Sequence, residues 1–176
     1  MKRSIAIGVV LMMVATSAPR VVAQPGSGDG RDSLTQALNG AWLPLDSGLV
    51  VSAREGTPLS AKYEIDDGAF QLSVYVMKAD TRSGETFVEV IVDHDTALVS
   101  KVDTITDGGD LAAARSQNAA MARAKRALAD ATAEAVKANA GYRALSAIPA
   151  LDNGRPIAEV TLVRGGDRKI VTERLD

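Results

Sequence analysis

The strongest constraint on the fold is an alternating stretch, LSAKYEIDDGAFQLSVYVM, which runs from Leu59 to Met77. Apolar side chains occupy every second position up to Ile65 and again from Phe70, as expected of strands with one buried face. Between these runs, the residues DDG at 66–68 supply short polar side chains and a glycine that can take positive φ. The stretch therefore predicts a β-hairpin with one apolar face.

A similar stretch occurs 86 residues later. The sequence LSAIPALDNG, from Leu145 to Gly154, aligns with LSAKYEIDDG at 59–68, and Asn153 takes the place of Asp67 in the turn. Apolar positions coincide again after the turn. Agreement in both the alternation and the turn chemistry predicts two copies of one structural unit.

The first 23 residues carry the pattern of a secretory signal peptide. Lys2 and Arg3 precede an apolar run at 5–15, and small residues lie before a cleavage site near Ala23–Gln24. The apolar run is shorter than the roughly 20 residues that a membrane span needs. We therefore expect a periplasmic or secreted protein with no stable membrane anchor after cleavage, followed by a flexible linker at 24–31.

Charge and cysteine content narrow the possible partners. Three of the 20 basic residues lie in the first 23 positions, so the remaining chain has 17 basic and 22 acidic residues and a net charge near −5. This balance disfavours nucleic acid as a partner. The chain has no cysteine, which excludes disulfides and fits a bacterial periplasm better than a small disulfide-stabilised secreted domain.

The rest of the chain predicts helices and antiparallel strands. We expect helices at 32–42 and 46–55, with a strand as the alternative for the second, and further strands at 87–92 and 98–102. Residues 111–140 contain 14 alanines and no glycine or proline, which predicts one long helix or two in near continuity, with a bend near 126–129. A second meander follows at 142–175. Trp42 is expected to pack the first helix against the sheet.

These elements predict an α+β fold made of two units, at 32–105 and 106–176. Each unit would be a helix packed on an antiparallel meander, and the long alanine-rich helix would join them. The lack of amide donors at Pro149 and Pro156 places their strands near sheet edges or bulges.

The chain resembles the PepSY domain in three features. These are the order of a helix and a meander, the turn at 66–68, and the run FVEVIVDHDTALVSKV from Phe87 to Val102. The resemblance covers residues 46–103 well and 128–176 more loosely. Ala97 departs from it, because the family tends to have glycine at that position. PepSY domains occur in propeptides of thermolysin-like metallopeptidases and in small exported bacterial proteins. The resemblance implies a module that binds a partner outside the cytoplasm. Because no peptidase domain follows the two units before Asp176, we do not expect a propeptide acting in cis.

Two acidic clusters are weak candidates for metal sites. Asp93, His94 and Asp95 are consecutive, but neighbouring residues of a strand alternate faces, and the chain has no second histidine or cysteine to complete a zinc set. Glu64 and the acidic residues of the 66–68 turn could bind calcium, but their spacing is not that of an EF-hand. We interpret both clusters as turns and expect no metal and no cofactor.

The sequence also lacks a motif for nucleophilic catalysis, so we expect no enzyme activity. The basic residues Arg115, Arg123, Lys125 and Arg126 are interpreted as a solvated helix face, with a partner surface or an anionic-lipid surface as the alternative.

Tyr75 and Met77 are the candidate contact surface, because they lie on the strand face opposite Val74 and Val76. We expect an exported, non-enzymatic binding module for a protein partner, with a peptidase as one candidate. The alternatives are a structural or envelope-stress protein that self-associates into a homo-oligomer, and a carrier with a small-ligand pocket between helix and sheet.

Overall fold

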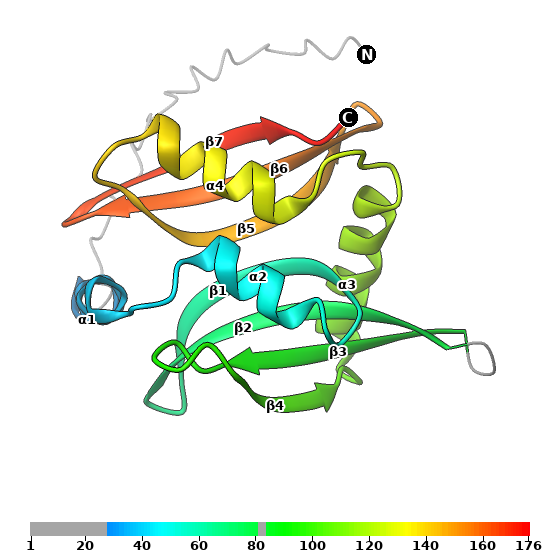
Figure 1. Cartoon of the computed structure of the whole chain (residues 1–176), viewed down its shortest axis with the longest axis horizontal. Helices are drawn as coiled ribbons and strands as arrows, with labels where there is room; N and C mark the ends of the chain where they lie inside the picture. Colours follow the sequence, from blue (N-terminus) through cyan, green and yellow to red (C-terminus); the bar gives the residue numbers. More distant parts are fainter. Residues whose placement is uncertain (1–27, 81–83) are drawn as a thin grey trace, which may run out of the picture.

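The computed structural model describes residues 28–80 and 84–176. Its strands form one antiparallel seven-stranded sheet in the order β4-β3-β2-β1-β5-β6-β7 (Figure 1). The helices are α1 (Gly28–Gly40), α2 (Leu45–Ser52), α3 (Gly108–Met121) and α4 (Leu128–Ala138). The strands are β1 (Thr57–Asp66), β2 (Ala69–Asp80), β3 (Gly84–Val92), β4 (Val99–Thr104), β5 (Arg143–Asp152), β6 (Arg155–Arg164) and β7 (Asp167–Arg174). The predicted signal peptide and its cleavage site lie outside the described residues.

Helices α2 and α4 lie side by side over one face of the sheet (Figure 1). The alternation predicted from the sequence produces this arrangement, since Leu72, Val74 and Val76 of β2 are all fully buried on that face. Val160 and Leu162 of β6 are buried in the same core. Each such side chain contributes about 1.5–3 kcal/mol by leaving water. One continuous core therefore spans both halves of the sheet.

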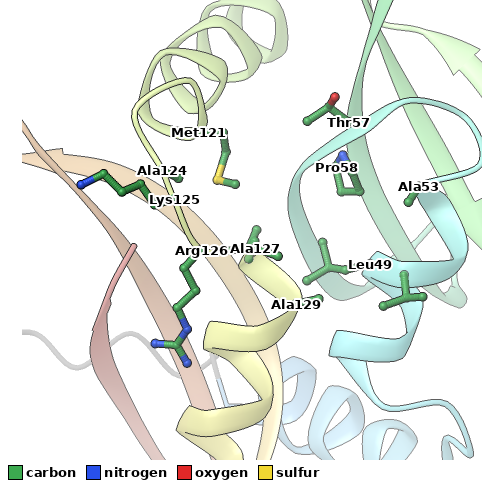
Figure 2. A pocket seen from close by; sticks show the side chains of 12 residues that line it. Leu49, Ala53, Thr57, Pro58, Met121, Ala124, Lys125, Arg126, Ala127 and Ala129 are labelled. Atoms are coloured by element: carbon green, nitrogen blue, oxygen red, sulfur yellow. The ribbon is translucent and has the colours of Figure 1, made fainter. Parts of the chain in front are cut away.

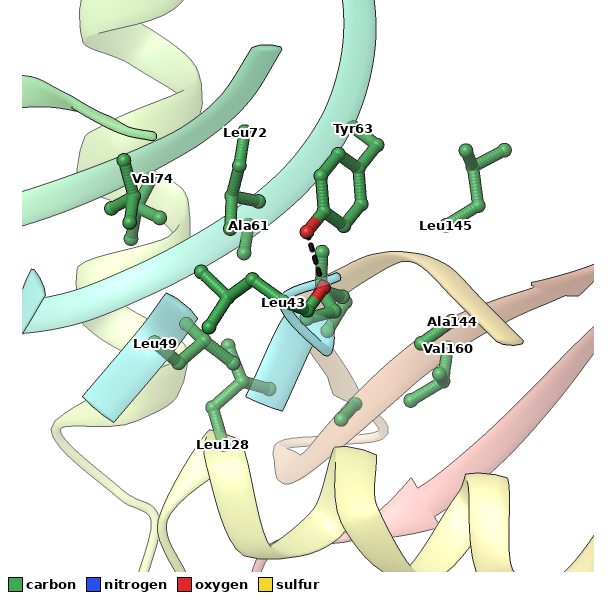
Figure 3. Packing of buried hydrophobic residues seen from close by; sticks show 14 of the residues in the cluster. Leu43, Leu49, Ala61, Tyr63, Leu72, Val74, Leu128, Ala144, Leu145 and Val160 are labelled. Atoms are coloured by element: carbon green, nitrogen blue, oxygen red, sulfur yellow. Dashed lines mark hydrogen bonds between the residues drawn. The ribbon is translucent and has the colours of Figure 1, made fainter. Parts of the chain in front are cut away.

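Tyr63 is buried in this core. Its ring stacks on Phe70 at a centroid distance of 5.1 Å. Its hydroxyl donates a hydrogen bond of 2.6 Å to the carbonyl of Leu43 (Figure 3). The chain segment between α1 and α2 is thereby fixed to the sheet.

The two hairpins have the same internal register at an offset of 86 residues. Both carry a register shift at corresponding positions, between Pro58 and Ser60 in β1 and between Ala144 and Ser146 in β5. Both turns have two consecutive residues with positive φ, at 67–68 and at 153–154. This is the geometry of a type I′ turn, which Asp-Gly and Asn-Gly favour.

The predicted fold class is nevertheless wrong, because the helices and strands do not form two separate helix-on-meander units. β1 pairs with β5 through Ala61↔Ala147 and Lys62↔Ser146, so the two meanders make one sheet. α2 contacts β5 as well as β1–β3, and it packs on α4. A free β1 or β5 would expose unpaired backbone groups, and each small unit would bury too little apolar surface alone.

Of the two alternatives predicted for residues 111–140, the single long helix is wrong. The segment forms two helices, and residues 122–127 separate them in place of a bend near 126–129. α3 ends at Met121 and α4 begins at Leu128. In the connection, the backbone N–H groups of Lys125 and Arg126 donate to the carbonyl of Leu175, at 2.7 and 3.1 Å, instead of continuing the helical ladder. The C-terminal residues therefore interrupt a segment whose composition is strongly helical.

The break sends α3 to the other face of the sheet. There Leu59, Phe87 and Ala114 form a second, smaller buried cluster. The hydroxyl of Ser60 donates a 2.8 Å hydrogen bond to Gln117 of α3. α3 thus partly covers the sheet face opposite Val74 and Val76, for which the sequence predicted no helix.

Candidate functional site

An apolar hollow lies between the C-terminal end of α2, the start of β1 and the α3–α4 connection. It has a volume of about 390 Å³, which lies within the range of about 300–1,000 Å³ that is typical of ligand sites. We call it the apolar pocket. It is lined by Leu49, Val50, Ala53, Thr57, Pro58, Met121, Ala124, Lys125, Arg126, Ala127, Leu128 and Ala129 (Figure 2).

Two local features place the walls of the pocket. α2 ends after Ser52, whose hydroxyl donates to the carbonyl of Leu49, and the chain then turns at Gly56 with φ of 150°. A side chain at Gly56 would collide with the backbone oxygen of Met77, so this close approach requires glycine. On the other side, the carbonyl of Leu175 holds the α3–α4 connection.

The hollow exists because the facing side chains are short. The connection and the start of α4 present Ala124, Ala127 and Ala129, and α2 presents Ala53. No aromatic side chain lines the pocket. Methyl groups on both walls cannot fill the distance that the backbone positions set, so space remains above the buried Leu49.

Charged groups border the pocket but do not enter it. Figure 2 shows the side chains of Lys125 and Arg126 extending away from the hollow. Arg126 is held by Glu134 at 2.7 Å and Glu173 at 3.5 Å. It therefore ties α4 to β7 instead of offering a free charge, whereas the exposed Lys125 makes no ion pair with a described residue. Thr57 carries the only hydroxyl in the lining.

The residues predicted as a contact surface lie elsewhere. Tyr75 and Met77 are half-buried and pack against the cluster of Leu59, Phe87 and Ala114 beneath α3. Burial, followed by a hydrogen bond to Asp110, raises the pKa of Tyr75. Their role in binding a partner stays a prediction, but they do not form an open apolar face.

The Asp93–His94–Asp95 cluster is a turn. One carboxylate oxygen of Asp93 accepts hydrogen bonds from the backbone N–H groups of Asp95 and Thr96 and from the Thr96 hydroxyl, at 2.8–3.0 Å. These bonds, with the Thr96 backbone bond contributing most, lower the pKa of Asp93. Among residues 28–80 and 84–176, no group of three metal-binding side chains converges.

Of the residues that line the pocket, the sequence singled out only Lys125 and Arg126, as part of a basic stretch. Pro58 and the alanines of the α3–α4 connection and α4 carry no chemical signal of their own, and they meet at the point where the alanine-rich segment is interrupted. Scarcity of aromatic residues, 3% of the chain, was the one available indication that the core is incompletely filled.

Comparisons with known proteins give no family assignment. No family model matches the chain, and no curated protein matches it either. Among solved structures, the chain is similar to a protein of Clostridium difficile 630 described as a "putative lipoprotein", with a TM-score of 0.44 and 13% identity over 77% of this chain and 88% of that chain.

In the part of the chain that the structure describes, no helix has the length and apolarity to cross a membrane.

Proposed function

We propose that this protein is an exported, non-enzymatic binding module that holds an apolar side chain of a protein partner in the apolar pocket. The observation that carries the proposal is the chemistry of the lining, which is almost entirely aliphatic. A small-molecule site usually adds a few placed polar groups that orient the ligand. A pocket in which the Thr57 hydroxyl is the only uncharged polar side-chain group suits an anchor side chain whose orientation is fixed by the rest of a protein interface.

The rim supports a protein partner as well. Val50 is 64% exposed at the edge of the pocket, so an apolar contact can extend beyond the hollow. Lys125, which has no ion pair with a described residue, offers a positive charge beside it. We therefore expect the partner to carry an acidic group next to its apolar anchor.

Export of the chain and a peptidase as partner remain part of this proposal. Export is supported by the signal-peptide pattern before Gln24, and a peptidase is suggested by the resemblance to the PepSY domain. The small-ligand carrier stays the second candidate, because a volume of about 390 Å³ is large enough for a small apolar molecule.

Filling the pocket tests the proposal. Ala129 lines the hollow, whereas Ala133 lies one helical turn further along α4 and is exposed. In a pull-down from periplasmic extract, Ala129→Leu is expected to reduce capture of a protein partner by about tenfold or more, which corresponds to about 1.4 kcal/mol. Ala133→Leu serves as the matched control and should capture the partner like the unaltered protein.

The outcomes separate the candidate functions. Equal capture by Ala129→Leu and the unaltered protein would contradict the proposal. Native mass spectrometry that finds a small molecule on the unaltered protein, but not on Ala129→Leu, would favour the carrier instead. Captured peptidases are then assayed for inhibition, and an effect that Ala129→Leu abolishes identifies the partner class.

A further inference from the structure

Trp42, the single tryptophan of the chain, is presented to solvent by a fixed backbone. Its side chain is 69% exposed, whereas Ala41 and Leu43 on either side are buried. The expectation that Trp42 packs α1 onto the sheet is therefore wrong. The neighbouring residues alternate inward and outward, and the indole falls on the outward side.

Besides the helical bonds of the Ala41 N–H, three hydrogen bonds to distant parts of the chain hold this backbone. The N–H of Leu43 donates to His94 at 3.0 Å, and the carbonyl of Leu43 accepts from the Tyr63 hydroxyl at 2.6 Å. The guanidinium of Arg143 donates to the carbonyl of Ala41 at 2.7 Å. The backbone that carries the exposed indole is therefore fixed at both neighbours, so binding has only the side-chain freedom of Trp42 left to restrict.

Beside Trp42 is a hollow of about 280 Å³ that includes Asp46, Tyr142 and Arg143 in its lining. We call it the tryptophan site. It lies at the N-terminal end of α2, at the opposite end of that helix from the apolar pocket. The carboxylate of Asp46 is half-buried and makes no hydrogen bond or ion pair with a described residue. A partly desolvated acceptor without a partner is available to a ligand.

The charges around the site select the class of ligand. Two cations already lie over the Tyr142 ring, Arg164 at 4.5 Å and Lys169 at 4.1 Å from its centroid. With Arg143 also in the lining, a cationic ligand is disfavoured. An anionic ligand would meet the carboxylate of Asp46. A neutral ligand that has both hydrogen-bond donors and acceptors avoids both conflicts.

We propose that the tryptophan site binds a sugar ring. The apolar C–H face of the ring would stack on the indole of Trp42, a hydroxyl would donate to the carboxylate of Asp46, and another would accept from an N–H of Arg143. The volume lies just below the usual range for drug-sized ligands, which fits one ring or the end of a saccharide chain. This inference is independent of the partner proposed for the apolar pocket.

Tryptophan fluorescence tests it directly, because Trp42 is the single tryptophan and can be excited at wavelengths that the three tyrosines do not absorb. The probes are glucose, N-acetylglucosamine and their linear β-1,4 tetramers, titrated into the purified protein. At least one probe is expected to give a saturable change in the intensity or wavelength of emission. Asp46→Ala should weaken that binding about tenfold or more while leaving the fluorophore in place.

Asp130→Ala is the matched control, since Asp130 also lies in the first turn of a helix, α4, but outside the site. It should bind like the unaltered protein. The proposal is overturned if all four probes leave the emission unchanged, or if Asp46→Ala and Asp130→Ala bind equally. It is also overturned if the emission changes on dilution without sugar, because Trp42 would then contact a second copy of the chain.

Discussion

Ala61 of β1 and Ala147 of β5 face each other where the two halves of the sheet join, and each occupies the same position within its own hairpin. Only this pair and the adjacent Lys62↔Ser146 pair link β1 to β5 in the described sheet. Prolines 58 and 149 lie just beyond the junction and cannot donate to a ladder. The register shift before Ser146 interrupts the pairing on the other side. A short contact thus unites two extensive meanders.

The junction should not tolerate a larger side chain. Ala147 is fully buried beneath the helices, so Ala147→Leu is expected to lower the free energy of unfolding by about 1–3 kcal/mol through overpacking. Urea unfolding followed by circular dichroism measures the change. Ala133→Leu, on an exposed position of α4, should stay within about 0.5 kcal/mol of the unaltered protein; similar losses in both variants would mean that the junction is not tightly packed.

The positive-φ turn residues give a prediction that depends on the backbone alone. Gly68 has φ of 78° and Gly166 does not have positive φ, while a Cβ at either position would have open space. Gly68→Ala should therefore destabilise the protein by about 1–2 kcal/mol through the left-handed conformation. Gly166→Ala should be neutral or slightly stabilising. Thermal unfolding compares the two, and equal melting temperatures would refute the assignment of the turn.

Local signals predicted the strands well and the assembly of the sheet poorly. Alternation at Leu72, Val74 and Val76 and the DDG turn identify β1 and β2, because a half-buried hairpin needs those residues wherever it sits. The pairing of Ala61 with Ala147 has no such signal, since two alanines fit many environments. The break after Met121 depends on the carbonyl of Leu175, a backbone group that every residue has.

The candidate sites were missed for the same physical reason. The apolar pocket is an absence of side-chain volume, and it follows from the break and from the short side chains around it. The exposure of Trp42 is set by hydrogen bonds from Tyr63 and Arg143 to the backbone of its neighbours. Neither arrangement can be predicted from the residue types of a single segment, because each depends on contacts between segments that are distant in the sequence.

Tyr63 should make the stability of the protein depend on alkaline pH. Burial raises the pKa of its hydroxyl from 10.0 to about 12, so the folded protein keeps a proton that the unfolded chain loses. This contribution is complete below pH 10 and is lost as pH rises from about 10 to 12. The loss amounts to about 3 kcal/mol of unfolding free energy.

The variant Tyr63→Phe isolates this effect. Near neutral pH it should be less stable by about 1 kcal/mol, because the carbonyl of Leu43 loses its hydrogen-bond donor. Between pH 10 and 12 the unaltered protein should lose stability more steeply than Tyr63→Phe, so the difference narrows and then reverses. Urea unfolding across this range measures the difference; a constant value would show that the hydroxyl is not perturbed in the folded state.

A substitution at Leu175 is expected to lower the free energy of unfolding most, because both the side chain and the backbone of this residue make contacts in the fold. The side chain is fully buried, its N–H donates to Pro156, and its carbonyl accepts from Lys125 and Arg126. Leu175→Ala should cost about 2–5 kcal/mol through the cavity that it leaves. Ile170→Ala on the preceding strand, β7, is the control, since Ile170 is 64% exposed and should cost less than about 0.5 kcal/mol. The buried side chain of Leu175 also positions the backbone carbonyl that holds one wall of the apolar pocket. Leu175→Ala keeps that carbonyl but removes its anchor, so it should weaken partner capture even at temperatures where circular dichroism shows it fully folded. Capture equal to that of Ile170→Ala under those conditions would mean that the pocket does not depend on this C-terminal contact.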